Sequence, residues 1–93
     1  MSEEAIVKRL NRAKKAASES LIKTGYKIIP SDNSEFCILG VRKREVRLIR
    51  VVVDKITSRD VEIVEGFELP GICTKEIWCR KLDKQDFEIK EIL

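Results

Sequence analysis

Apolar residues recur at helical spacing over the first two dozen positions of the chain. They follow one another at intervals of three and four, in the order Ile6, Leu10, Ala13, Ala17 and Leu21. This spacing places them on one stripe of an amphipathic helix over residues 3–24. Ser2 is a suitable N-cap for this helix, and Gly25 stands where a C-cap glycine belongs.

The remainder of the chain has shorter apolar runs separated by turn-forming residues. These runs predict strands over residues 26–29, 35–42, 46–54, 75–81 and 87–92. A tight charged turn is expected at 43–45. Residues 51–53 are all valine and apolar on both faces, so we expect a central strand there. A second helix is expected from residue 57 or 58 to about 68, since Thr57 with Asp60 resembles a capping box. The order helix, three strands, helix, two strands predicts one α/β (α+β) domain over residues 1–93.

Length and composition favour a small soluble protein of the cytoplasm. The chain has 93 residues, of which 38% are charged, against about 25% in an average protein. Its first residues do not resemble a secretory signal, and no apolar run approaches the roughly 20 residues that span a bilayer. Cys37, Cys73 and Cys79 cannot all pair within one chain, so we expect free buried thiols. Because the chain has no histidine, we expect neither a zinc site nor a histidine-dependent catalytic triad.

Charge is divided unevenly between the two parts of the chain. Residues 1–59 contain 14 basic and 7 acidic residues, a net charge of +7. Residues 60–93 contain 5 basic and 9 acidic residues, a net charge of −4. A basic part of this kind suits a nucleic acid or another polyanion. Alternatively, the acidic part could dock against the basic part of a second copy, or both could be solvated faces.

One region has the outline of a hairpin motif. Gly25-Tyr26 begins the first strand, SEFCIL (34–39) and VRLIRVV (46–52) form the hairpin, and Leu69-Pro70 precedes KEIW (75–78). With the element order, this pattern resembles the PD-(D/E)XK nuclease superfamily, in particular small archaeal Holliday-junction resolvase-like proteins. In that family the hairpin carries an Asp on its first strand and Glu-x-Lys on its second. Aligned in this way, the Asp position holds Cys37, the Glu position Arg50 and the Lys position Val52.

The resemblance implies a restriction-endonuclease-like core, a mixed sheet flanked by helices, whose catalytic positions hold unsuitable residues. The family's acidic pair holds a divalent cation, and its lysine helps to activate water. A thiol is a poor ligand for magnesium, Arg50 would place positive charge at the cation, and Val52 cannot polarise water. Residues 50 and 52 share one face of a strand because side chains alternate. We therefore expect no catalytic residues, no metal and no cofactor.

Two alternatives to this interpretation stay open. In an unrelated α/β fold, Arg50 would be an edge residue and Val52 a core residue. In a nuclease whose catalytic groups have moved, nearby charged side chains would act instead: Asp32, Glu35, Glu45, Asp54 and Lys55.

Three functions agree with these observations. The first is a catalytically inactive nuclease-like domain that binds the backbone of duplex or branched DNA or serves in a DNA-processing assembly. Its expected contacts are basic residues: Lys8, Arg9, Arg12, Lys15, Arg42, Lys43, Arg44 and Arg50. With one tyrosine and one tryptophan in the chain, stacking on single-stranded bases is less favoured. The second function is a homodimeric structural or regulatory module that binds no nucleic acid, and the third is a divalent-metal nuclease with relocated residues.

Overall fold

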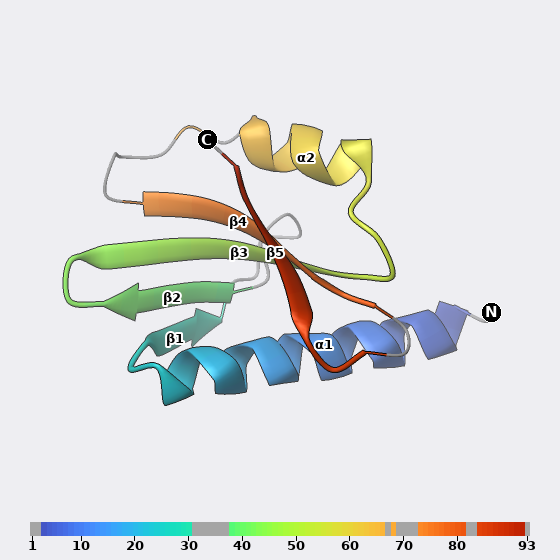
Figure 1. Ribbon diagram of the computed structural model, residues 1–93, viewed down its shortest axis with the longest axis horizontal. Coiled ribbons are helices and arrows are strands. Elements are labelled where there is room, and N and C mark those ends of the chain that lie inside the picture. Colours follow the sequence, from blue (N-terminus) through green and yellow to red (C-terminus); the bar gives the residue numbers. More distant parts are fainter. Residues whose placement is uncertain (1–2, 31–37, 67, 69–72, 82–83, 93) are drawn as a thin grey trace.

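A mixed sheet and two helices make up the part of the chain that the structure describes. The computed structural model describes residues 3–30, 38–66, 68, 73–81 and 84–92. In chain order its elements are α1 (Glu3–Lys23), β1 (Lys27–Pro30), β2 (Ile38–Arg42), β3 (Glu45–Val53), α2 (Ser58–Glu65), β4 (Cys73–Arg80) and β5 (Phe87–Ile92). The sheet lies between the helices, with α1 on one face and α2 on the other (Figure 1). This is an α+β arrangement, and the predicted order of elements is confirmed.

The five strands of the described ranges lie in the order β1-β2-β3-β4-β5. β1, β2 and β3 form an antiparallel meander, in which Ile38 lies opposite Ile49 and Arg42 opposite Glu45. β4 runs parallel to β3, and β5 returns antiparallel to β4. A parallel pair needs a crossover connection, which α2 supplies between β3 and β4. β3 is therefore the central strand, as its run of valines predicts.

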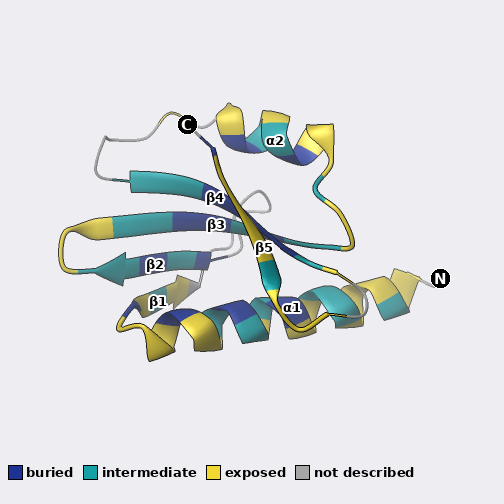
Figure 2. Ribbon diagram, viewed as in Figure 1, coloured by how far each residue is buried: buried dark blue, intermediate teal, exposed yellow. Residues whose placement is uncertain are grey.

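The larger hydrophobic cluster lies between α1 and the sheet. Ala13, Ala17 and Leu21 are almost completely buried in it, and Leu10 packs against it. The other buried members are Tyr26, Ile38, Ile49, Val51 and Trp78. Ile6, in contrast, is 44% exposed, so the predicted stripe is buried only from Leu10 onward. The cause is that the first turns of α1 extend beyond the strands (Figure 2).

A smaller hydrophobic cluster lies between α2 and the opposite face of the sheet. Its buried members are Leu48, Val64, Ile77 and Ile92. The predicted capping box is present: the Asp60 backbone N–H donates to Thr57 Oγ1 at 3.2 Å, and the Thr57 N–H donates to Asp60 Oδ2 at 2.9 Å. α2 ends at Glu65 rather than near residue 68, with Gly66 as its C-cap. The low helix propensity of glycine is consistent with this early end.

The remaining differences from the expected structure are small. Of the strand predicted over 35–42, residues 35–37 lie outside the described residues. β4 begins at Cys73, two residues earlier than expected, because its pairing with β3 already starts there, opposite Val46. Cys79 is buried and Cys73 half-buried, and neither forms a disulfide, whereas Cys37 lies outside the described residues. Neither of the two helices is long and apolar enough to cross a membrane.

Candidate nucleic-acid interface

The two β3 positions assigned by the resemblance lie on the face of the sheet that α2 covers. Nε of Arg50 donates to Oδ1 of Asp60 in α2 at 3.0 Å. Val52 packs into the cluster beneath α2, so the predicted sharing of a strand face is confirmed. β3 is central, and the alternative interpretation of Arg50 as an edge residue is therefore wrong. Cys37, at the third position, lies outside the described residues.

Asp60 joins this pair to the start of α2. Burial alone would raise the pKa of Asp60, because it disfavours the charged carboxylate. Hydrogen bonds from Thr57 and from Arg50 outweigh burial, so the pKa is lowered instead. Arg50 thus helps to hold α2 on the sheet, which is a structural role.

No acidic pair lies on either face of the described hairpin. Side chains alternate between faces, so moving the alignment by one residue would bring the motif positions to the α1 face. On that face the shifted positions would fall among Ile49, Val51 and Val53, which are apolar, and the face carries Glu45 and Arg47 nearer the β2–β3 turn. Glu45 is the single acidic residue within β2 and β3. Among the residues that the structure describes, no group of three His, Cys, Asp or Glu side chains could hold a metal ion.

The two described acidic residues proposed for a relocated nuclease site, Glu45 and Asp54, each bind basic or hydroxyl groups of this chain. Glu45 accepts from Tyr26 Oη at 2.7 Å and from Arg42 at 3.2 Å, and these two residues lower the pKa of Glu45. Asp54 forms an ion pair with Arg9. Nine residues of extended strand, about 30 Å, separate Glu45 from Asp54, so the two cannot share one ion. Of the other candidates, Lys55 is exposed, and Asp32 and Glu35 lie outside the described residues.

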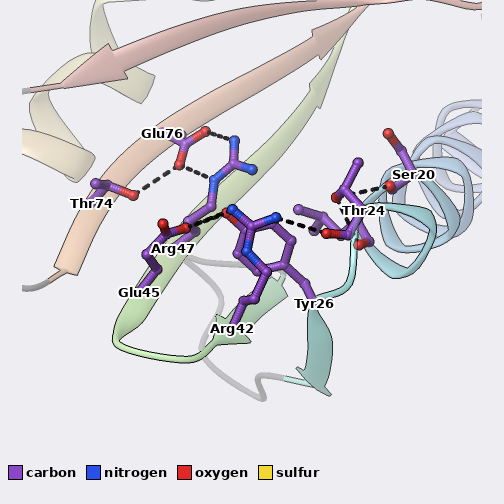
Figure 3. Close-up of polar contacts among 9 residues, drawn as sticks. Ser20, Thr24, Tyr26, Arg42, Glu45, Arg47, Thr74 and Glu76 are labelled. Carbon is purple, nitrogen blue, oxygen red and sulfur yellow. Dashed lines mark hydrogen bonds and ion pairs between the residues drawn. The ribbon is translucent and has the colours of Figure 1, made fainter.

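A partly buried ion pair lies beside Glu45 on the α1 face of the sheet (Figure 3). Arg47 of β3 and Glu76 of β4 pair through two hydrogen bonds, of which Nε to Oε2 measures 2.7 Å. Thr74 Oγ1 at 2.9 Å and Trp78 Nε1 at 3.1 Å donate to the same carboxylate. Burial alone would raise the pKa of Glu76, but these hydrogen bonds and the Arg47 charge outweigh it and lower the pKa. A charged carboxylate with four donors is a structural group rather than a general acid.

The basic residues of the β2–β3 turn differ in their roles. The Arg42 guanidinium lies 4.5 Å from the centre of the Tyr26 ring and donates to the Thr24 carbonyl at 2.8 Å. It therefore ties the end of α1 to the hairpin (Figure 3). Lys43 and Arg44 are exposed at the turn.

The eight basic residues predicted to contact DNA come from three places in the fold. Four are in α1 between residues 8 and 15, three are at the β2–β3 turn, and Arg50 is beneath α2. Arg42 contacts Thr24, just after the end of α1, and Thr24 is twelve residues from Arg12, about 18 Å along a helix axis. Lys8 pairs with Glu4 at 3.7 Å on the exposed side of the helix, and Lys15 is exposed. The structure thus separates the predicted contacts into three groups.

Arg9 and Arg12 line a pocket together with three basic residues that the sequence prediction did not include. The lining residues are Arg9, Arg12, Val53, Arg80, Lys81, Lys84 and Gln85, and we call this site the basic pocket. Its volume is about 330 Å³. It lies on the α1 face of the sheet, beside the carboxyl ends of the parallel strands β3 and β4. Five of its seven lining residues are cations.

Acidic residues neutralise only part of this charge. Asp54 pairs with Arg9, and Glu88 lies 3.9 Å from Lys81. Over the described ranges, ion pairs are absent for the three remaining cations, Arg12, Arg80 and Lys84. The pocket therefore keeps an excess of positive charge that a bound anion would neutralise.

The local backbone explains why these segments meet. Asp54 follows β3 with a φ of 72°, a left-handed conformation that Asp tolerates better than most residues. Its N–H donates to the Arg80 carbonyl at 2.9 Å, and its carboxylate binds Arg9 of α1. The carboxyl ends of parallel strands are a common place for ligands, so Arg80 could have been found from sequence if the parallel pairing had been known.

Comparison with known proteins adds no relative. Protein-family models, curated proteins and solved structures give no match to this chain. A proposal for its function must therefore be based on the geometry and charge of the chain itself.

Proposed function

We propose that this chain is a catalytically inactive domain of restriction-endonuclease-like fold that binds the phosphate backbone of duplex or branched DNA. The observation that carries the proposal is the basic pocket, where five cations converge from α1, from the end of β4 and from the residues that follow β4. Arg and Lys bind phosphate oxygens by charge and hydrogen bonds without reading base sequence.

The arrangement of elements supports the nuclease-like fold. The order α-β-β-β-α-β-β and the mixed sheet between two helices agree with what the resemblance implies. The described hairpin has no acidic pair on either face, which supports binding without metal-dependent cutting.

Arg12 and Arg80 are the cations best placed to contact a phosphate. Arg80 lies opposite Phe87, which packs on the α1 face, so Arg80 points to that face as well. Arg12 follows Arg9 by three residues and lies on the same side of α1. Both side chains line the basic pocket, and neither forms an ion pair with a described residue.

The strength of the salt dependence follows from the number of pocket cations that form no ion pair with a described residue. Each phosphate neutralised contributes about −0.9 to the slope of log affinity against log salt concentration. Arg12, Arg80 and Lys84 therefore predict a slope of about −2.7, or about a 40-fold loss of affinity between about 50 and 200 mM salt.

The test is a titration of duplex and four-way-junction DNA at these two salt concentrations with Mg²⁺ present. In the Arg12→Ala/Arg80→Ala variant we expect the slope to fall to about −0.9. The matched control is Lys43→Ala/Arg44→Ala, which removes the same charge from the β2–β3 turn and should leave the slope unchanged. A flat salt response of the wild type, or an equal effect of both double variants, would contradict the proposal.

The same titration distinguishes the two alternative functions. Divalent-dependent cutting that is lost on Asp32→Ala or Glu45→Ala would establish a nuclease with relocated residues. Absence of binding at both salt concentrations would favour a protein-interaction module.

A further inference from the structure

The outer edge of β5 is the edge at which this sheet can be extended. β5 has six residues, Phe87–Ile92, and contains neither proline nor glycine. Within the described sheet it pairs with β4 on one side only. The opposite edge strand, β1, has four residues and ends at Pro30, which has no N–H to donate. An unpaired edge presents backbone N–H and C=O groups to another strand.

The middle of β5 has an exposed apolar side chain between two side chains of opposite charge. Ile89, near the middle of the strand, is 51% exposed. It lies on the same face as Phe87, which packs in the α1-side cluster. Glu88 and Lys90 flank Ile89 and share the other face with Ile92.

We infer that β5 pairs antiparallel with β5 of a second copy of this chain, about a two-fold axis through Ile89. A two-fold axis that relates two antiparallel edge strands is perpendicular to the sheet. Residues directly opposite each other have their side chains on the same face, so the residue at the axis must lie opposite its own copy. Centred on Ile89, the pairing brings the two Ile89 side chains together. It also places Glu88 of each copy opposite Lys90 of the other, so the strand is complementary to itself.

Charge excludes the neighbouring registers. An axis through Lys90 would place two lysines opposite each other and Ile89 opposite Glu91. An axis through Glu88 would oppose two glutamates and would pair only residues 87–89 of the strand. Like charges directly opposite each other destabilise a strand pair. The register centred on Ile89 pairs residues 87–91 without such a conflict.

This dimer would place both basic pockets on one surface, because the axis keeps the α1 faces on the same side. The two Phe87 residues are offset by four positions, about 13 Å along the strands. Arg80, opposite Phe87 in β4, is separated from its copy by three strand spacings, about 14 Å across the sheet. The pockets would then lie roughly 20 Å apart, less than one duplex turn of about 34 Å. This consequence rests on the proposed function, whereas the pairing of β5 does not.

Charge reversal tests the register. In sedimentation equilibrium, Glu88→Lys and Lys90→Glu should each weaken the dimer about tenfold, because both cross-strand pairs become repulsive. The double variant Glu88→Lys/Lys90→Glu restores opposite charges and should return to wild-type affinity. A monomer at every concentration, or a dimer that responds to neither single reversal, would overturn the inference.

A disulfide tests the centre of the interface. In the Ile89→Cys variant the two cysteines face each other, with Cα atoms about 4.5–5.5 Å apart, a distance that a disulfide can join. The matched control is Ile29→Cys on β1, because Ile29 is 50% exposed. We expect oxidation to give a dimer linked through position 89 and none through position 29. Equal cross-linking at both positions would contradict the proposed axis.

A neutral variant separates this inference from the proposed function. Ile89→Ser keeps every charge, so its salt slope for DNA reports on the basic pocket of a single chain. Loss of the dimer with a remaining slope of about −2.7, the value expected for one pocket, supports both statements. A dimer that binds no DNA overturns the proposed function alone, and a monomeric wild type with salt-dependent binding overturns the dimer alone.

Discussion

Replacing Glu76 with glutamine removes the charge from the most buried carboxylate of the described residues. Glu76 is 4% exposed and accepts hydrogen bonds from Arg47, Thr74 and Trp78. Glutamine has nearly the same size, but its amide NH₂ would face donors where an acceptor is needed. The hydrogen bond to Glu76 raises the pKa of Arg47, and without Glu76 the guanidinium would remain charged. Glu76→Gln therefore leaves a half-buried cation without its partner.

The size of the effect follows from the burial of both groups. Removing one partner of a buried ion pair costs about 3–5 kcal/mol. The Arg47 side chain is 23% exposed, and its guanidinium lies 5.3 Å from the Tyr26 ring centre and 5.4 Å from that of Trp78. Partial hydration and the two rings retain some stabilisation, so we expect a loss of about 2–3 kcal/mol. In a domain of this size the melting temperature should fall by about 10–20 °C.

The measurement is urea and thermal denaturation of Glu76→Gln, followed by circular dichroism. The control is Glu91→Gln, because Glu91 lies opposite Glu76 in β5 but is exposed. It should change the stability by less than about 0.5 kcal/mol. Replacing both partners, in Arg47→Met/Glu76→Leu, should recover most of the loss. A Glu76→Gln protein as stable as the wild type would refute this account of the pair.

The lowered pKa of Glu76 also gives the effect a pH dependence. A carboxylate whose pKa is lowered by folding contributes its full stabilisation above the unfolded pKa of about 4.3. The contribution is lost as the pH falls through the lower pKa of the folded state. The stability difference between wild type and Glu76→Gln should thus be constant from about pH 6 to 8 and shrink below about pH 4. A difference that grows in acid would contradict this sign.

Three further predictions concern other parts of the fold. Asp60→Ala removes the capping box with Thr57 and the ion pair with Arg50, and should cost about 2 kcal/mol in urea denaturation; a loss below about 0.5 kcal/mol would contradict the role of this cap. Burial raises the pKa of the Cys79 thiol, so iodoacetamide should label half-buried Cys73 first in the native protein, and both equally in urea; prior labelling of Cys79 would contradict its burial. Gly25→Ala should cost about 1 kcal/mol, because Gly25 has a φ of 94°, whereas an unchanged midpoint would contradict this conformation.

The elements could be predicted from sequence because each depends on local patterns. The spacing of Ala13, Ala17 and Leu21 places them on the buried stripe of α1, and the capping box marks the start of α2. The all-valine run identifies the central strand, because both faces of β3 are covered. Burial of Ile6 could not be judged in this way, because it depends on where the sheet ends beneath the helix.

The basic pocket could not be predicted because its residues come from distant segments. Arg80, Lys81 and Lys84 belong to residues 60–93. The net charge of that part is negative, so it gave no indication of a basic site there. The parallel pairing of β3 with β4 brings Arg80 beside α1, and sequence patterns did not indicate which strands pair.

Net charge was misleading in the basic part of the chain for a related reason. Four of its arginines pair with carboxylates that the fold brings to them: Arg9 with Asp54, Arg42 with Glu45, Arg47 with Glu76 and Arg50 with Asp60. These arginines hold helices and strands together, and much of their charge is neutralised within the molecule. Electrostatic attraction for a polyanion depends instead on surface cations whose charge no neighbouring described carboxylate neutralises. By that criterion Arg12, Arg80 and Lys84 outrank Arg42 and Arg50, although only Arg12 of these three could be selected from the sequence.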